Sequence, residues 1–147
     1  MPVEHLDGGA KIATLEAAER VEFGPLSHYR PLLADGTTPV RTGIQVCAPG
    51  YAAPMHSHPY VEMLFILEGE ADVWLQGQEA HKRRLKAGDT VALPPDVPHS
   101  FSVAGDAPMR LLGIHHSTER IVNYLDRETD AKGYPLLYKA SEPKASQ

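Results

Sequence analysis

The stretch GYAAPMHSHPYVE, residues 50–62, places two histidines and a glutamate within seven residues. Successive side chains of a β-strand point to opposite faces, so residues two apart point the same way. His56 and His58 therefore share one face of a strand, and Glu62 has the same parity unless Pro59 interrupts it. Two imidazoles and a carboxylate on one face can converge on a single divalent ion.

A simpler interpretation competes with this one, because a histidine on a strand is more often a surface or hydrogen-bonded residue than a ligand. The local pattern alone leaves both interpretations open. Burying two imidazoles and a carboxylate inside a small barrel without an ion would cost on the order of several kcal/mol in unpaired polar groups. This cost favours a metal site at residues 56–62.

The chain around this stretch has the pattern of an all-β protein. Thirteen prolines and twelve glycines interrupt its 147 residues. Short strands with turn signals roughly every 8–12 residues are typical of a sandwich, jelly roll or barrel. We predict strands over residues 42–48, 60–67, 71–75, 79–85, 90–93, 99–103 and 109–115.

The sequence predicts one domain with three parts: an extended arm at residues 1–39, a barrel at 40–125 and a tail at 126–147. Within the arm, residues 11–20 have a helix-forming composition, whereas the prolines in 21–33 favour an extended edge segment. After the barrel, Ser117 is predicted to cap a short helix. The apolar side of that helix would hold Ile121, Val122, Tyr124 and Leu125. Residues 140–147 are expected to be loose.

Two motifs in the chain resemble those of the cupin family. Residues 50–62, followed by six residues and Gly69, resemble the first cupin motif with every spacing intact. Gly88, five residues, Pro94 and later His99 resemble the second motif. The resemblance implies a cupin-type double-stranded β-helix, or jelly-roll barrel. It also implies four metal ligands, which are His56, His58, Glu62 and His99.

Two positions depart from the second motif. Asp96 stands where the family usually has glycine, and Val103 stands where it often has asparagine. Neither position is a ligand, so the predicted metal site is unaffected. The departure leaves open whether the loop around Asp96 keeps the family's geometry.

Three imidazoles and one carboxylate suit one divalent ion per chain, and Fe, Mn, Ni and Zn all fit such a mixed nitrogen and oxygen site. Four protein ligands leave two positions of an octahedral ion for a substrate, or for a substrate and dioxygen. Leu64 and Ile66 have inward parity and would make the pocket floor apolar, which favours an organic ligand over a highly charged one. His115 and His116 are adjacent, so only one of them faces the pocket. The pocket residues predicted from these patterns are Gln45, Tyr60, Leu64, Phe101 and His115.

The resemblance implies a metal-dependent enzyme acting on a small organic substrate. A set of three histidines and one glutamate resembles the quercetin dioxygenase arrangement, which favours an oxygenase. A metal-dependent isomerase, lyase or decarboxylase is an alternative, as is non-catalytic binding of a sugar-like or acidic ligand. An ion-free structural barrel is the third alternative.

Charge and hydropathy narrow the partners and the location. A net charge of −5 argues against nucleic acid as a partner. The longest apolar stretch, residues 63–67, is too short to span a bilayer. Residues 1–10 lack the pattern of a signal peptide, and a single Cys47 excludes an intramolecular disulfide. We therefore expect a cytoplasmic protein. The family resemblance also implies a homodimer, with residues 21–33 as the segment suspected of crossing between subunits.

Overall fold

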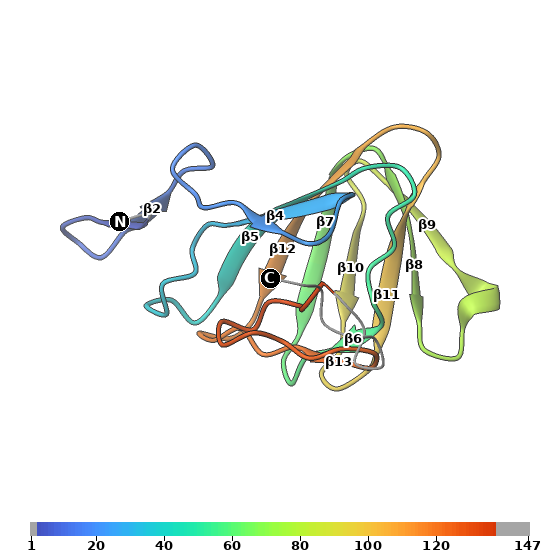
Figure 1. Cartoon of the computed structure of the whole chain (residues 1–147). Helices are drawn as coiled ribbons and strands as arrows, with labels where there is room; N and C mark the ends of the chain where they lie inside the picture. Colours follow the sequence, from blue (N-terminus) through green and yellow to red (C-terminus); the bar gives the residue numbers. More distant parts are fainter. Residues whose placement is uncertain (1–2, 138–147) are drawn as a thin grey trace, which may run out of the picture.

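Two antiparallel β-sheets face each other across an apolar core in the computed structural model, which describes residues 3–137 (Figure 1). The larger sheet has the order β10-β7-β12-β5-β4-β3, and the smaller has the order β13-β6-β11-β8-β9. The larger sheet comprises β3 (Val21–Glu22), β4 (Ser27–Pro31), β5 (Arg41–Cys47), β7 (Glu62–Glu68), β10 (Thr90–Leu93) and β12 (Met109–His115). The smaller comprises β6 (His56–Ser57), β8 (Glu70–Leu75), β9 (Arg83–Lys86), β11 (His99–Ala104) and β13 (Asn123–Tyr124).

The period-two pattern of β7 shows how the sequence forms this sandwich. Glu62, Leu64 and Ile66 point inward and are buried, while Met63 and Phe65 point outward and are exposed. Burying alternate apolar side chains of facing strands removes their surface from water, and this is the main stabilisation of such a fold. The core so formed consists of Cys47, Tyr51, Ala53, Leu64, Ile66, Ala71, Val73, Leu93, Phe101, Met109 and Leu111.

Most of the predicted strands are confirmed to within one residue at each end, and two differ by more. The strand predicted at 60–67 begins at Glu62. The strand predicted at 79–85 is instead a 3₁₀ turn, η1 (Glu79–His81), followed by β9. The register of β9 is consistent with the ion pair from Arg84 Nε to Asp72 Oδ1, 2.7 Å across the β8–β9 ladder.

The N-terminal segment contains strands where its composition suggested a helix. Residues 11–20 form no helix, and β2 (Lys11–Ala13) pairs with β1 (Val3–His5) in a hairpin beside the sandwich (Figure 1). Residues 21–33 were predicted as an extended edge segment, and this is confirmed: β3 and β4 form the edge of the larger sheet. There β4 pairs with β5 of the same chain.

The short helix predicted after Ser117 is wrong. The chain there is extended, and β13 pairs with β6, so that Tyr124 lies opposite His56. The amide of Leu125 donates to the carbonyl of Met55 at 3.1 Å, an ordinary length for such a bond. These backbone groups are satisfied by a distant strand rather than by a local helix, which a local apolar pattern cannot reveal. Residues 140–147, expected to be loose, lie outside the described residues.

No helix within residues 3–137 is long and apolar enough to cross a membrane.

Candidate metal centre and its pocket

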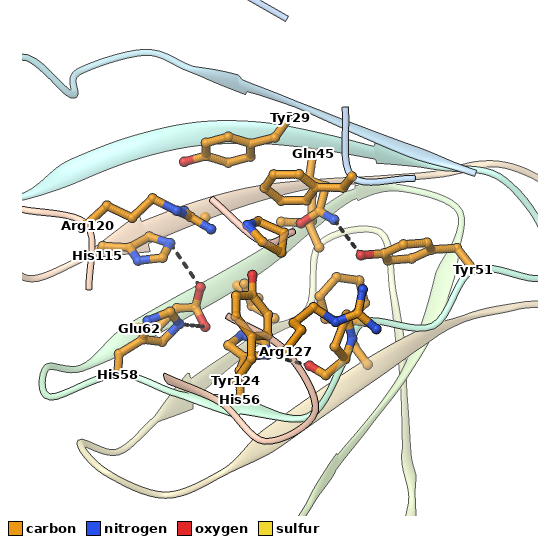
Figure 2. Close-up of a pocket in the computed structure, with 18 of the residues that line it drawn as sticks. Tyr29, Gln45, Tyr51, His56, His58, Glu62, His115, Arg120, Tyr124 and Arg127 are labelled. Carbon is orange, nitrogen blue, oxygen red and sulfur yellow. Dashed lines mark hydrogen bonds and ion pairs between the residues drawn. The ribbon is translucent and has the colours of Figure 1, made fainter. Parts of the chain in front are cut away.

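The four predicted ligands come together at one end of the sandwich. His56 lies on β6, His58 follows it, Glu62 opens β7 and His99 opens β11 opposite His56. All four side chains are buried, and their ligand atoms lie within 4.8 Å of one another. Figure 2 shows three of them, His56, His58 and Glu62, at the base of a pocket. The group could therefore hold one metal ion.

Each of the three histidines uses one ring nitrogen on a backbone carbonyl. These contacts are His56 Nδ1 to Pro54 O at 2.7 Å, His58 Nδ1 to Ile121 O at 2.8 Å, and His99 Nδ1 to Val97 O at 3.0 Å. A carbonyl oxygen only accepts, so each Nδ1 must carry the proton. The other nitrogen, Nε2, then has a free lone pair in the neutral ring, which is the arrangement that a metal-binding histidine needs.

The Nε2 atoms of His58 and His99 lie 3.3 and 3.0 Å from Oε1 of Glu62. With Nδ1 protonated, each such contact joins two acceptors, and His58 Nε2 is buried without a hydrogen-bond partner in the described chain. A buried acceptor left unpaired costs roughly 1–3 kcal/mol. A cation among these atoms would remove that cost, so the residues present fit a bound metal ion.

A second chain of contacts fixes the other oxygen of Glu62. Nε2 of His115 lies 2.9 Å from Oε2 of Glu62, and Nδ1 of His115 lies 3.1 Å from the Tyr60 hydroxyl. That hydroxyl accepts from Arg41 Nη2 at 2.8 Å, so its single proton is free to donate to His115. His115 then donates its own Nε2–H to Glu62. The relay runs from Arg41 through Tyr60 and His115 to the carboxylate.

Electrostatics set the charge state of the group. Burial would raise the pKa of Glu62, but the contact with His115 holds it well below its usual range. Burial lowers the pKa of His56 to about 3 and also lowers the pKa of His115. The ligand group therefore contains an ionised carboxylate at Glu62 and a neutral imidazole at His56. Metal ligands bind in these same protonation states.

Beside the ligand group lies a cavity with about 50 Å³ of water-accessible space. Four of the five predicted pocket residues line it, namely Gln45, Leu64, Phe101 and His115. The fifth, Tyr60, lies behind His58, with ring centroids 5.0 Å apart and the planes 21° from parallel. His115 faces the pocket and His116 is exposed. Ile66 points inward but lies in the core rather than at the cavity. The apolar side of the cavity is made by Leu64, Phe101 and Leu111.

Several lining residues were not predicted, because they come from segments far away in the sequence. Arg120, Tyr124 and Arg127 lie on the C-terminal segment, and Tyr29 lies on β4 (Figure 2). The sequence carries no spacing signal for them. Their positions depend on the β6–β13 pairing and on the edge strand.

Two glycines inside strands, Gly43 and Gly113, do carry a signal, because a glycine there marks a close approach of another group, and Gly113 lines the cavity. They are partners in the β5–β12 ladder, and both are buried. A Cβ on Gly43 would overlap the hydroxyl of Tyr29. The missing side chain therefore lets the Tyr29 ring lie flat over β5.

The loop around Asp96 keeps the backbone geometry of the second motif, although aspartate stands where the family usually has glycine. Asp96 has a φ of 63°, the left-handed conformation that glycine adopts most easily and that aspartate tolerates. Its amide donates to the carbonyl of His58 at 2.7 Å. The loop therefore keeps a glycine-like backbone and supports the segment that carries His58.

An antiparallel β-sandwich with three buried histidines and a glutamate at one end defines a class of small β-barrels that could carry one metal ion. The family model of the cupin domain matches residues 43–115. The chain therefore belongs to the cupin family, as the two motifs predicted.

Solved structures show the same fold. A cupin-like protein from Thermotoga maritima is 26% identical, with a TM-score of 0.63 over 73% of this chain and 86% of that chain. Oxalate decarboxylase from Bacillus subtilis is 20% identical with a TM-score of 0.67, and this chain covers only 31% of its length. An oxalate oxidase is 22% identical with a TM-score of 0.64, and 62% of its length is covered. Curated protein sequences give no significant match.

Proposed function

We propose that this protein is a metal-dependent enzyme that binds a small organic substrate on a divalent ion and oxidises it with dioxygen. The observation that best supports this proposal is the convergence of three histidine Nε2 atoms on Glu62 beside a cavity. Of these atoms, His58 Nε2 is buried and has no hydrogen-bond partner in the described chain. A buried acceptor cluster of this kind is costly unless a cation binds there. The adjoining cavity gives a substrate access to the same place.

In this proposal His56, His58, Glu62 and His99 hold the ion, which can be Fe, Mn, Ni or Zn. When bound, the ion supplies Lewis-acid or oxygen-activating chemistry. His115 donates to one oxygen of Glu62 and so keeps that oxygen oriented, while the other oxygen faces His58 and His99.

The apolar side of the cavity limits the access of water. Leu64, Phe101 and Leu111 line it, and each is at most 5% exposed. A substrate held against these side chains would meet the ligand group in a medium of low polarity, where electrostatic interactions are stronger than in water.

A non-oxidative reaction is the second candidate, as an isomerase, lyase or decarboxylase. The observation that favours it is that two groups with exchangeable protons, His115 and Tyr124, line the cavity. Such groups can give or take a proton at a bound molecule without dioxygen. The structural neighbours named above include a decarboxylase and an oxidase, so one fold is compatible with both reaction classes.

The deciding experiment is oxygen consumption by protein loaded separately with Fe(II), Mn(II), Ni(II) and Zn(II). The substrates are a panel of enolisable diketones, phenols and small organic acids, with products followed by mass spectrometry. The proposal predicts oxygen uptake with at least one metal, abolished by Glu62→Gln. The matched control is Glu68→Gln at the exposed far end of β7.

The other outcomes are equally informative. Product formation without oxygen uptake would replace the oxygenase with the non-oxidative enzyme. Ligand binding that survives Glu62→Gln, with no turnover of any compound, would favour a non-catalytic binding protein.

A further inference from the structure

Arg120 brings a positive charge to the pocket from outside the ligand group. It lies between β12 and β13, and its side chain extends over the cavity between Tyr29 and His115 in Figure 2. Its Nε donates to the carbonyl of Gly133 at 2.9 Å. Gly133 has a φ of 83°, and a Cβ there would meet the Arg120 carbonyl at 2.7 Å. The C-terminal segment is thus shaped to hold this arginine closely.

Three aromatic rings surround the guanidinium. Its central carbon lies 4.9 Å from the ring centroid of Tyr134, 5.3 Å from that of Tyr29 and 5.7 Å from that of Phe23. These rings stabilise the cation through their faces and also exclude water from it. A partly dehydrated guanidinium forms strong hydrogen bonds to a carboxylate, often two at once.

No carboxylate of residues 3–137 forms an ion pair with Arg120. The other arginine of the pocket, Arg127, differs in this respect, because Asp126 contacts it at 2.9 and 3.2 Å. With a divalent ion bound, the ion and Arg120 would bring three positive charges against one negative charge on Glu62. The occupied pocket would therefore favour a ligand with negative charge.

The cavity also limits the size of the ligand. A water molecule needs about 10–15 Å³ of such space, so the cavity of about 50 Å³ has room for roughly four groups of that size. A second cavity, of about 460 Å³, adjoins the first and shares five lining residues with it, namely Phe23, Tyr51, Pro54, Arg127 and Leu137. The first cavity, beside the ligand group, therefore suits a ligand of a few heavy atoms.

We propose that the substrate is a small organic acid whose carboxylate binds Arg120 while another of its oxygens binds the ion. This inference rests on the proposed function and names the substrate class of the same site. The acid's carbon skeleton would lie against Leu64, Phe101 and Leu111, which makes the ligand apolar in the middle and polar at its ends. The apolar floor expected from Leu64 is thus one part of a pocket that the cationic Arg120 also lines.

Binding to zinc-loaded protein tests this without depending on turnover. Calorimetry would measure pyruvate and malonate against their neutral counterparts, pyruvamide and malonamide, after the zinc content of each sample is determined. The acids are expected to bind at least tenfold more tightly than the amides. In Arg120→Gln, acid binding should weaken by roughly 10- to 100-fold, as for loss of a charge-assisted hydrogen bond. Amide binding should change by less than about twofold, because an amide makes no such bond.

The matched control is Arg84→Gln, an exposed arginine on β9 that is expected to bind the acids like the wild type. Equal affinity of acid and amide for the wild type would overturn the proposal, whether or not the Arg120 variant folds. Wild-type acid affinity in a folded Arg120→Gln protein would overturn it too, as would the failure of both acids to bind. Failure of the wild type to retain zinc would instead contradict the metal site, and therefore the proposed function.

Discussion

A buried histidine becomes a ligand or a hydrogen-bond donor according to what its two nitrogens already contact. His56, His58 and His99 each have Nδ1 on a backbone carbonyl, so Nε2 is left as an acceptor. In His115, Nδ1 faces the Tyr60 hydroxyl, and Nε2 is left as a donor to Glu62. The same residue type thus has two roles at this site, and the neighbouring atoms decide which.

Tyr60→Phe tests the relay to Glu62. Without the hydroxyl, His115 loses the partner that fixes its tautomer, and the carboxylate loses its fixed orientation. Losing such an outer hydrogen bond typically lowers metal affinity 10- to 100-fold, and we expect about a tenfold loss. Competition with a fluorescent chelator would measure it. The control is Tyr51→Phe, whose hydroxyl accepts from Gln45 Nε2 at 3.4 Å instead. Equal metal affinity in the two variants would contradict the relay.

The backbone conformation of Asp96 gives a further prediction. Its φ of 63° is strained for most residues and free of strain for glycine. We expect Asp96→Gly to leave the free energy of unfolding unchanged or slightly higher. Asp96→Val should lower it by about 1–2 kcal/mol, because a β-branched residue resists this conformation. Urea denaturation would measure both. Equal losses in the two variants would mean that the aspartate side chain, and not the backbone, matters here.

At the scale of elements, the packing of β4 on β5 depends on the small Gly43 lying under the Tyr29 ring. Gly43→Ala adds a methyl group where that ring already lies, and such overpacking typically costs about 1–3 kcal/mol. Combining it with Tyr29→Leu should cost less than the sum of the two single changes, because the smaller side chain makes room. Thermal and urea unfolding of the four proteins form a double-mutant cycle. Strict additivity would contradict the contact.

The N-terminal hairpin is joined to the loop before β5 by a contact between His5 Nε2 and Asp35 Oδ2, 2.8 Å apart. The Thr37 hydroxyl, together with His5, lowers the pKa of Asp35 to about 2. Because this pKa lies below the ordinary value of 3.8, the stabilising contribution is complete above pH 3.8. It is lost as the pH falls through about 2.

We expect Thr37→Val to raise the pKa of Asp35 toward the ordinary value. A carboxyl-detected NMR titration would follow it. The control is Thr38→Val, whose hydroxyl donates to Val40 instead. If both variants titrate alike, the assignment of the shift to Thr37 fails.

In the molecule as a whole, the outer face of the larger sheet carries an apolar patch over β7 and β12. Met63, Phe65 and Leu67 of β7 are 44, 36 and 36% exposed, beside the half-buried Leu112 and Ile114 of β12. Contiguous apolar surface of this kind usually marks an interface. We propose that a second copy of the chain covers it about a two-fold axis, since one patch can then pair with itself. This places the expected dimer contact on β7 rather than on residues 21–33.

Sedimentation velocity tests this expectation. Phe65→Lys should shift the protein from dimer to monomer, because it buries a charge in the proposed interface. Leu125→Lys is the control at an exposed site outside the larger sheet. A wild-type monomer would contradict the dimer, and a dimer unaffected by Phe65→Lys would place its interface elsewhere.

The parts of the fold that the sequence predicted are those set by local rules. Strand parity placed His56, His58 and Glu62 on one side, and turn residues marked the strand ends. The contact of His115 with Glu62 depends on the β12–β7 register, which pairs these two residues although they are more than fifty positions apart in the sequence. The position of Arg120 depends on the segment that leads into β13, whose backbone groups pair with β6. The apolar residues of this segment have a helix-like spacing, and the sequence alone could not show that a distant strand pairs with it.

The most direct test of the metal site is the metal content of untagged protein purified without chelators. Inductively coupled plasma mass spectrometry would measure it. We expect about one divalent ion per chain, because four buried ligands of this type form a complete site. His58→Ala should lose most of that ion, whereas His81→Ala, at an exposed turn, should keep it. A wild-type protein that stays far below one ion per chain, even after incubation with Fe(II), Mn(II), Ni(II) or Zn(II), would contradict the metal site.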